Sequence, residues 1–120
     1  MAHEGVKLMA SSLDYVEDSL KRVDYNLLEF KLINHIASGS GFINVKVLVD
    51  EKEVTNSSTM KIEEQEATKV KPMFVTSSYG DKVLFNIKLD EPLKHGYHKI
   101  KVDCGVEMLG SYSVKFEGTV

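Results

Sequence analysis

The sequence predicts an antiparallel β-sandwich, and two observations lead to this prediction. Between residues 43 and 116, apolar and polar residues alternate in one run after another, and each run ends in turn-forming residues. Side chains on a β-strand point to opposite faces with a period of two, so each run has one face to bury and one to expose. Such runs, separated by turns, are typical of antiparallel sheets that pack face to face.

Seven runs are long enough to be strands. Their in-phase residues are Leu28, Phe30 and Leu32; Ile43, Val45, Val47 and Val49; Met60 and Ile62; Val70, Pro72 and Phe74; Val83, Phe85, Ile87 and Leu89; His98, Ile100, Val102, Cys104 and Val106; and Tyr112, Val114 and Phe116. We expect each set to face the core.

The N-terminal part has a different pattern. Val6, Leu8 and Ala10 indicate a short first strand. In residues 12–23, apolar residues then recur at helical spacing, with acidic and basic residues four positions apart. This spacing predicts a helix of two or three turns, and an irregular strand connection is the alternative.

Two further segments constrain the sheets. Ser38-Gly39-Ser40-Gly41 is expected to be a flexible turn, because it lacks the Lys-Ser/Thr of a phosphate-binding loop. Pro72 cannot donate a ladder hydrogen bond, so the strand at 70–74 belongs at a sheet edge or a bulge. An unpaired edge could support self-association of the chain.

The bulk composition excludes several classes of protein. The chain has 120 residues, and we expect one domain over residues 1–120. Its net charge of -3 disfavours nucleic-acid binding. No stretch approaches the length of a membrane span, and Met1–Ala10 lacks the apolar region of a signal peptide. The composition fits both a cytoplasmic protein and a module excised from an extracellular surface protein, so the localisation stays open.

The order of these segments carries a resemblance to a known family. Residues 44–54 form a strand closed by a Val-Asp-Glu-Lys-Glu-Val turn, and residues 96–103 read Gly-Tyr-His-Lys-Ile-Lys-Val-Asp. Together with Asn34 and the closing run at 110–114, they resemble the CARDB group of immunoglobulin-like domains, over roughly residues 28–116. The departures are His35-Ile36 after Asn34, and Glu51 where the family turn has glycine. The resemblance implies an immunoglobulin-like antiparallel β-sandwich of about seven strands, found as a module in surface proteins.

His98 is the first candidate for chemistry. His95 and His98, with the nearby Asp90, Glu91 and Cys104, would form the site of a small metal-dependent enzyme or metal-binding protein. The alternation favours another role, because His98 shares the parity of the buried residues in its run. At such a corner, a ring nitrogen can hydrogen-bond back to the preceding loop, as a tyrosine does in related sandwiches.

Cys104 is expected to be a small buried hydrophobe, because it lies on the same face as His98. As the single cysteine it excludes an internal disulfide. Six residues along a strand separate it from His98 by about 20 Å, too far for a catalytic pair. We predict no catalytic residue, no bound metal and no cofactor.

Three aromatic residues are better candidates for binding. Phe42 and Tyr97 are out of phase with the core residues of their strands, and Tyr79 lies in a Ser/Gly loop. Exposed aromatic side chains can anchor a partner. We therefore predict a non-catalytic binding or structural module that contacts protein, or with less support glycan, through Phe42, Tyr79 and Tyr97.

Overall fold

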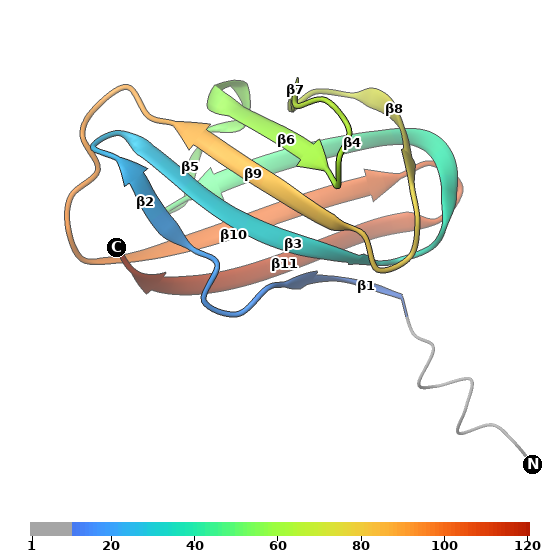
Figure 1. Cartoon of the computed structure of the whole chain (residues 1–120), viewed down its shortest axis with the longest axis horizontal. Helices are drawn as coiled ribbons and strands as arrows, with labels where there is room; N and C mark the ends of the chain where they lie inside the picture. The colour runs from blue at the N-terminus through green and yellow to red at the C-terminus, as the bar shows by residue number, and fades with distance from the viewer. Residues whose placement is uncertain (1–10) are drawn as a thin grey trace, which may run out of the picture.

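The computed structural model describes residues 11–120 as two antiparallel β-sheets packed face to face (Figure 1). This is the predicted β-sandwich. None of the described residues forms a helix long and apolar enough to cross a membrane. The predicted strand at Val6–Ala10 lies outside the described residues.

The first sheet has the order β1-β3-β9-β6-β7, and β2 also pairs with β3. Its strands are β1 (Ser12–Tyr15), β2 (Lys21–Asp24), β3 (Leu27–His35), β6 (Ser58–Ile62), β7 (Thr68–Lys69) and β9 (Lys82–Lys88). A short 3-10 helix, η1 (Thr55–Ser57), leads into β6.

The second sheet has the order β11-β10-β4-β5, and β8 pairs with the first half of β4. Its strands are β4 (Gly39–Val49), β5 (Lys52–Glu53), β8 (Met73–Ser77), β10 (Tyr97–Val106) and β11 (Gly110–Thr119). Across the two sheets, seven strands have five or more residues, which agrees with the predicted number.

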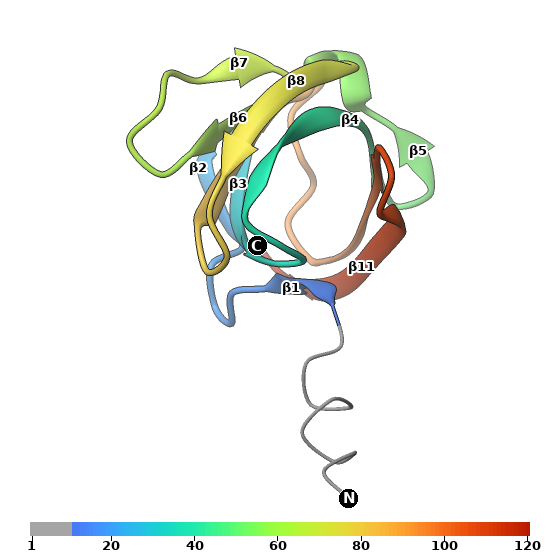
Figure 2. The same ribbon diagram turned by 90° about the vertical axis from the view of Figure 1, so that its right-hand side faces the viewer.

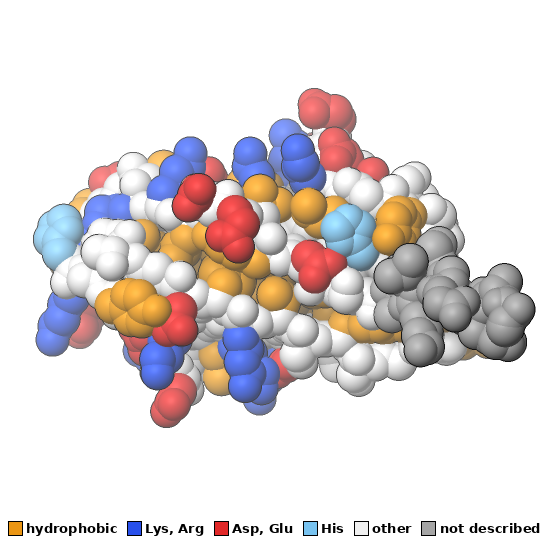
Figure 3. Space-filling model, turned by 90° about the horizontal axis from the view of Figure 1, so that it is seen from below, with side chains coloured by type: hydrophobic (Ala, Val, Ile, Leu, Met, Phe, Trp, Pro, Cys, Tyr) orange, Lys and Arg blue, Asp and Glu red, His pale blue; other side chains and the backbone are white. Residues whose placement is uncertain are grey.

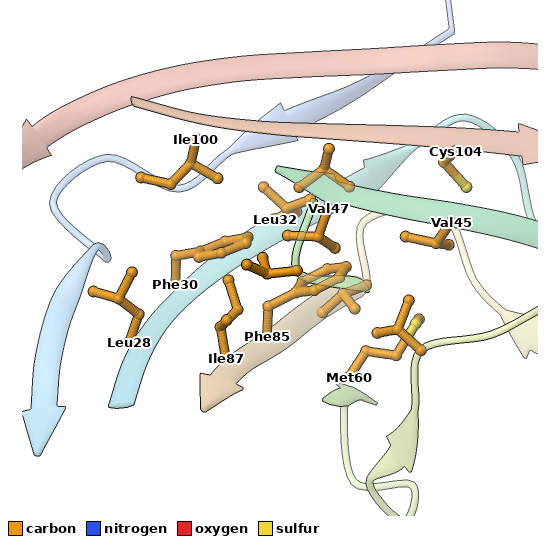
Figure 4. Close-up of a cluster of buried hydrophobic side chains, with 14 of the residues drawn as sticks. Leu28, Phe30, Leu32, Val45, Val47, Met60, Phe85, Ile87, Ile100 and Cys104 are labelled. Atoms are coloured by element: carbon orange, nitrogen blue, oxygen red, sulfur yellow. The ribbon is translucent and has the colours of Figure 1, made fainter. Parts of the chain in front are cut away.

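The core lies between the sheets and consists of the in-phase residues of the longer strands. Phe30 on β3 stacks on Phe85 of β9 with ring centroids 5.1 Å apart, and Phe116 meets Phe30 edge-on at 4.9 Å. Figure 4 shows Val47 and Ile100 of the second sheet pointing into the same cluster. Burial of these apolar side chains is the main stabilising contribution to the fold.

The two ends of the sandwich carry different loops. At the right-hand end of Figure 1, which faces the viewer in Figure 2, lie the β3–β4 loop, the β8–β9 loop and the β10–β11 turn. We call this the β3–β4 end. The β4–β5 turn, the β9–β10 loop and the C-terminus lie at the opposite end, the β9–β10 end.

The helix predicted for residues 12–23 is wrong. The segment forms β1 and β2, joined by a turn in which Asp18 has a φ of 63°. β1 runs antiparallel to β3, and Tyr15 stacks on Phe116 with centroids 4.0 Å apart. Bridging the two sheets therefore outweighs the weak helical preference of this segment.

Two other local predictions are corrected. Most of the predicted turn at 38–41 belongs to β4, where Gly39 pairs with Ser77. Val70 is buried but Phe74 is exposed, so these two residues do not share a face. Pro72 lies between β7 of one sheet and β8 of the other, and the alternation resets where the chain changes sheet. The predicted position at an edge holds, because β4 is the only described strand that pairs with β8.

Candidate functional site

Phe42 and Phe74 form an exposed aromatic pair on the outer face of the second sheet. The register places Phe42 of β4 directly opposite Phe74 of β8. Their rings meet edge-on, with centroids 5.2 Å apart and an interplanar angle of 77°. Phe42 is 55% exposed and Phe74 is 59% exposed. Cross-strand aromatic pairs stabilise a sheet, but this pair also leaves a large apolar area in water.

A surface groove of about 480 Å³ adjoins this pair. Phe42, Pro72 and Met108 line it, together with Gly105 of β10. Gly105 lies opposite Asn44 of β4, and its missing side chain leaves the outer face shallow at this point. We call Phe42, Pro72, Phe74 and Met108 the apolar patch.

Met108 is the most exposed member of the apolar patch. It occupies the β10–β11 turn with a φ of 68°, a conformation that favours glycine or asparagine, and it is 96% exposed. Leu109 beside it is also exposed. A long apolar side chain at a strained and solvated turn position adds nothing to the core, which makes it a candidate contact residue.

Tyr79 lies at the same end of the sandwich as Phe42. Its backbone N–H donates to Ser38 Oγ at 2.8 Å, and its ring lies 5.3 Å from that of His35. The His35 ring nitrogen Nδ1 is in turn 2.6 Å from the Asp14 carboxylate. The hydrogen bond from His35 lowers the pKa of Asp14. The exposed Tyr79 ring therefore rests on an ordered polar cluster.

Tyr97 is exposed as predicted, but it lies far from the other two aromatic residues. It opens β10 and pairs with Thr119, at the β9–β10 end. A hydrogen bond to the Glu117 carboxylate raises the pKa of its hydroxyl. The structure thus brings Phe42 and Tyr79 to one end and leaves Tyr97 at the other.

His98 has the structural position that the alternation predicts. It is 8% exposed; its Nδ1 lies 2.6 Å from Asp50 Oδ2, and its Nε2 lies 2.7 Å from the Lys94 carbonyl oxygen. Both partners accept hydrogen bonds, so this geometry requires both ring nitrogens to donate, as they do in imidazolium. Because Asp50 lies in the β4–β5 turn and Lys94 in the β9–β10 loop, His98 joins these two segments. Asp50 also accepts a hydrogen bond from the Lys99 N–H.

The electrostatics of His98 agree with this geometry. Burial alone would lower its pKa, but the hydrogen bonds to Asp50 and to the Lys94 carbonyl raise it above the usual value. Burial would raise the pKa of Asp50, whereas the hydrogen bonds from His98 and Lys99 lower it. The pair is therefore favoured in its charged form.

The geometry gives no support to the metal site considered for His95 and His98. Both nitrogens of His98 are occupied by protein partners, and His95 is exposed in the β9–β10 loop. Among residues 11–120, no group of three His, Cys, Asp or Glu side chains is arranged to hold a metal ion. Cys104 is buried at the opposite end of β10, and desolvation raises the pKa of its thiol to about 11.

Pro72, Phe74 and Met108 are the residues of the apolar patch that the sequence analysis missed. The alternation predicts Phe74 in the core, because it is in phase with Val70. Only the change of sheet at Pro72 turns the Phe74 side chain to the outer face. Two apolar residues in the turn after β10 were a readable signal, because such turns are usually polar.

Comparisons with known proteins support the fold alone. No family model matches the chain, and no curated protein matches it. One similar solved structure is a family 123 glycoside hydrolase from Clostridium perfringens, at 10% identity and a TM-score of 0.51. The similarity covers 92% of this chain but only 27% of the hydrolase.

Two smaller structures have lower TM-scores. A conjugative transposon lipoprotein from Bacteroides eggerthii is 10% identical, with a TM-score of 0.46 over 89% of this chain and 94% of that one. The archaellum periplasmic stator protein FlaG from Sulfolobus acidocaldarius is 12% identical, with a TM-score of 0.42 over 89% and 100%. At 10% identity, the similarity to part of the hydrolase supports the β-sandwich fold and says nothing of the activity of this chain.

Proposed function

We propose that this chain is a non-catalytic immunoglobulin-like module that binds another protein through the apolar patch. The observation that carries the proposal is the Phe42–Phe74 pair, two large aromatic side chains in contact with each other and more than half exposed. Exposed aromatic groups clustered beside a groove are typical of interface anchors.

A protein partner fits the apolar patch better than a glycan does. Sugar rings stack on the flat face of an aromatic side chain, whereas Phe42 and Phe74 meet edge-on. The sequence also has no tryptophan. Pro72 and Met108 extend the patch with aliphatic surface, which suits an apolar or aromatic segment of a partner protein.

Self-association through the edge of β8 is the second candidate, and it has less support. β8 has five residues, and within residues 11–120 it pairs along one edge only, with β4. Gln65 Nε2 donates to the Thr76 carbonyl oxygen at 2.8 Å, so one acceptor of this strand already has a partner. Capping of this kind protects an edge strand against pairing with another chain.

Enrichment of binding proteins on matched variants tests the proposal. The immobilised wild-type chain is compared with Phe42→Ser/Phe74→Ser and with Tyr97→Ser, an exposed aromatic control at the β9–β10 end. Each protein enriched by the wild type is then purified and titrated against all three. The double variant should weaken binding at least about tenfold, while Tyr97→Ser should change it less than about twofold. Equal losses in both variants, or no loss in either, would contradict the proposal.

A further inference from the structure

A cavity of about 320 Å³ lies between the two sheets at the β3–β4 end and is partly open to solvent. Leu32, Ile62 and Val83 line it from the first sheet, and Ile43, Val75 and Val106 from the second. In Figure 4, Met60, Val45 and Cys104 lie at one end of the core cluster, and these three also line the cavity. The volume falls within the range of small-molecule sites, about 300–1,000 Å³.

The polar side chains around the cavity already form hydrogen bonds within the protein. Asn34 Nδ2 donates to the Ala37 carbonyl, to Ser77 Oγ and to the Ser78 carbonyl. Its Oδ1 accepts from two backbone N–H groups of the β3–β4 loop. Ser40 Oγ is bonded to Thr76 Oγ1. These residues hold the rim in place, and they leave few polar groups to bind the polar part of a ligand.

The charge around the cavity further restricts the class of ligand that can bind. Of the described residues that line it, Glu107 alone carries a charge, and it lies in the β10–β11 turn. An anionic head group would lie near this carboxylate with no lysine or arginine in the lining to oppose it. Carboxylate and phosphate ligands are therefore disfavoured.

The volume of the cavity favours an extended aliphatic chain over a single small ring as its ligand. An engineered apolar cavity of about 150 Å³ stays dry and binds one benzene molecule. The cavity between these sheets is about twice as large, so one small ring would leave much of it empty. An extended aliphatic chain fills such a volume and makes contacts with both sheets.

We propose that this cavity binds the aliphatic chain of a non-anionic amphiphile, with the chain between the sheets and the polar head at the mouth. The cavity lies between the two sheets, whereas the apolar patch lies on the outer face of the second sheet. This inference therefore goes beyond the proposed docking of a protein and does not depend on it. The cavity and the groove of the apolar patch adjoin, because Ile43, Val106, Glu107 and Met108 line both.

Titration of the full chain with octan-1-ol, octanoate and octylammonium tests the ligand class. We expect saturable binding of octanol and of octylammonium, followed by methyl NMR shifts of the cavity residues, and octanoate binding weaker than either by about tenfold or more. Glu107→Gln should reduce the difference between octanol and octanoate. No saturable binding of octanol or of octylammonium, or octanoate binding as tightly as either, would overturn the proposal.

Filling the cavity tests the location. Val75→Phe and Val106→Phe each add volume to a partly buried lining position, and Val23→Phe on exposed β2 is the control. Both cavity variants should lose octanol binding at least about tenfold while Val23→Phe retains it, and thermal unfolding confirms that each variant is folded. Octanol binding that persists in folded Val75→Phe and Val106→Phe would contradict the location. Binding that appears only in a Leu8→Asp variant would assign the cavity to the chain's own residues 1–10, and would also overturn the proposal.

Discussion

At the scale of single residues, His98 has the largest structural role of the three histidines in residues 11–120. Its buried ring hydrogen-bonds to the Asp50 carboxylate and to the Lys94 carbonyl. His98→Ala removes a buried ring, takes its partner from the Lys94 carbonyl and leaves Asp50 with the Lys99 N–H alone, so we expect the free energy of unfolding to fall by about 2–4 kcal/mol. His95→Ala, at an exposed loop position, should change it by less than about 0.5 kcal/mol. Urea unfolding of both variants measures this, and equal effects would contradict the assigned role.

The same pair predicts how stability depends on pH. The pKa of His98 is raised in the folded protein, so its contribution is fully present below about pH 6.5 and is lost as the pH rises through the folded-state pKa. The pKa of Asp50 is lowered, so its contribution is lost only in acid. Arg22, whose charge opposes protonation of His98, moderates the first effect. Above pH 6.5, wild-type stability should fall relative to that of His98→Gln, whereas His95→Gln should follow the wild type. Parallel curves for wild type and His98→Gln would contradict the charged pair.

Cys104 should react slowly with alkylating agents. Burial raises the pKa of its thiol from 9.0 to about 11. At pH 8 this shift lowers the thiolate fraction about 100-fold, and only the thiolate is an efficient nucleophile. Iodoacetamide labelling followed by mass spectrometry measures the rate, with the urea-unfolded chain as the control. Equal rates in the folded and unfolded chain would show that the cavity end of β10 is open.

At the scale of elements, the β10–β11 turn combines strain with exposure. Met108 adopts a φ of 68° and is almost fully exposed. Met108→Gly should therefore raise the free energy of unfolding by about 0.5–1 kcal/mol, because glycine adopts this conformation without a steric penalty. If Met108 is a contact residue, the same change should weaken partner binding.

Glu51→Gly is the matched control for this prediction. Glu51 has a φ of 71° in the β4–β5 turn, at the end of the sandwich opposite to Met108. Like Met108→Gly, the Glu51→Gly substitution should stabilise the fold, but it should leave partner binding unchanged. Stabilisation by Met108→Gly with full retention of binding would remove Met108 from the docking surface.

The strands show how much of the fold could be predicted from sequence. A period of two identifies β3, β4, β9 and β10 because one face of each is buried against the other sheet. Residues 12–23 were misassigned because their extended form depends on contacts with β3 and with Phe116, which a local pattern does not contain. The candidate site has the same limit. The phase of β4 exposes Phe42, but only the pairing of β4 with β8 places Phe74 beside it.

At the scale of the whole molecule, apolar side chains reach the surface in two different places, the seam between the sheets and the apolar patch. In Figure 3, which looks onto the side of β1 and β11, hydrophobic side chains form a band with charged side chains on both sides. Leu13, Tyr15 and Phe116 are partly buried hydrophobic residues packed against the core from these strands, so this band belongs to the seam between the sheets. The apolar patch differs, because its aromatic pair lies on an outer face and has no role in joining the sheets.

The central claim is that a partner protein docks on the apolar patch, and hydrogen–deuterium exchange of the complex tests it most directly. Binding of the purified partner should slow exchange in β8, in the first half of β4 and in the β10–β11 turn. The β4–β5 turn and the β9–β10 loop should keep the exchange rates of the free chain. Protection confined to the β9–β10 end around Tyr97, with no change in β8 or at Met108, would contradict the claim.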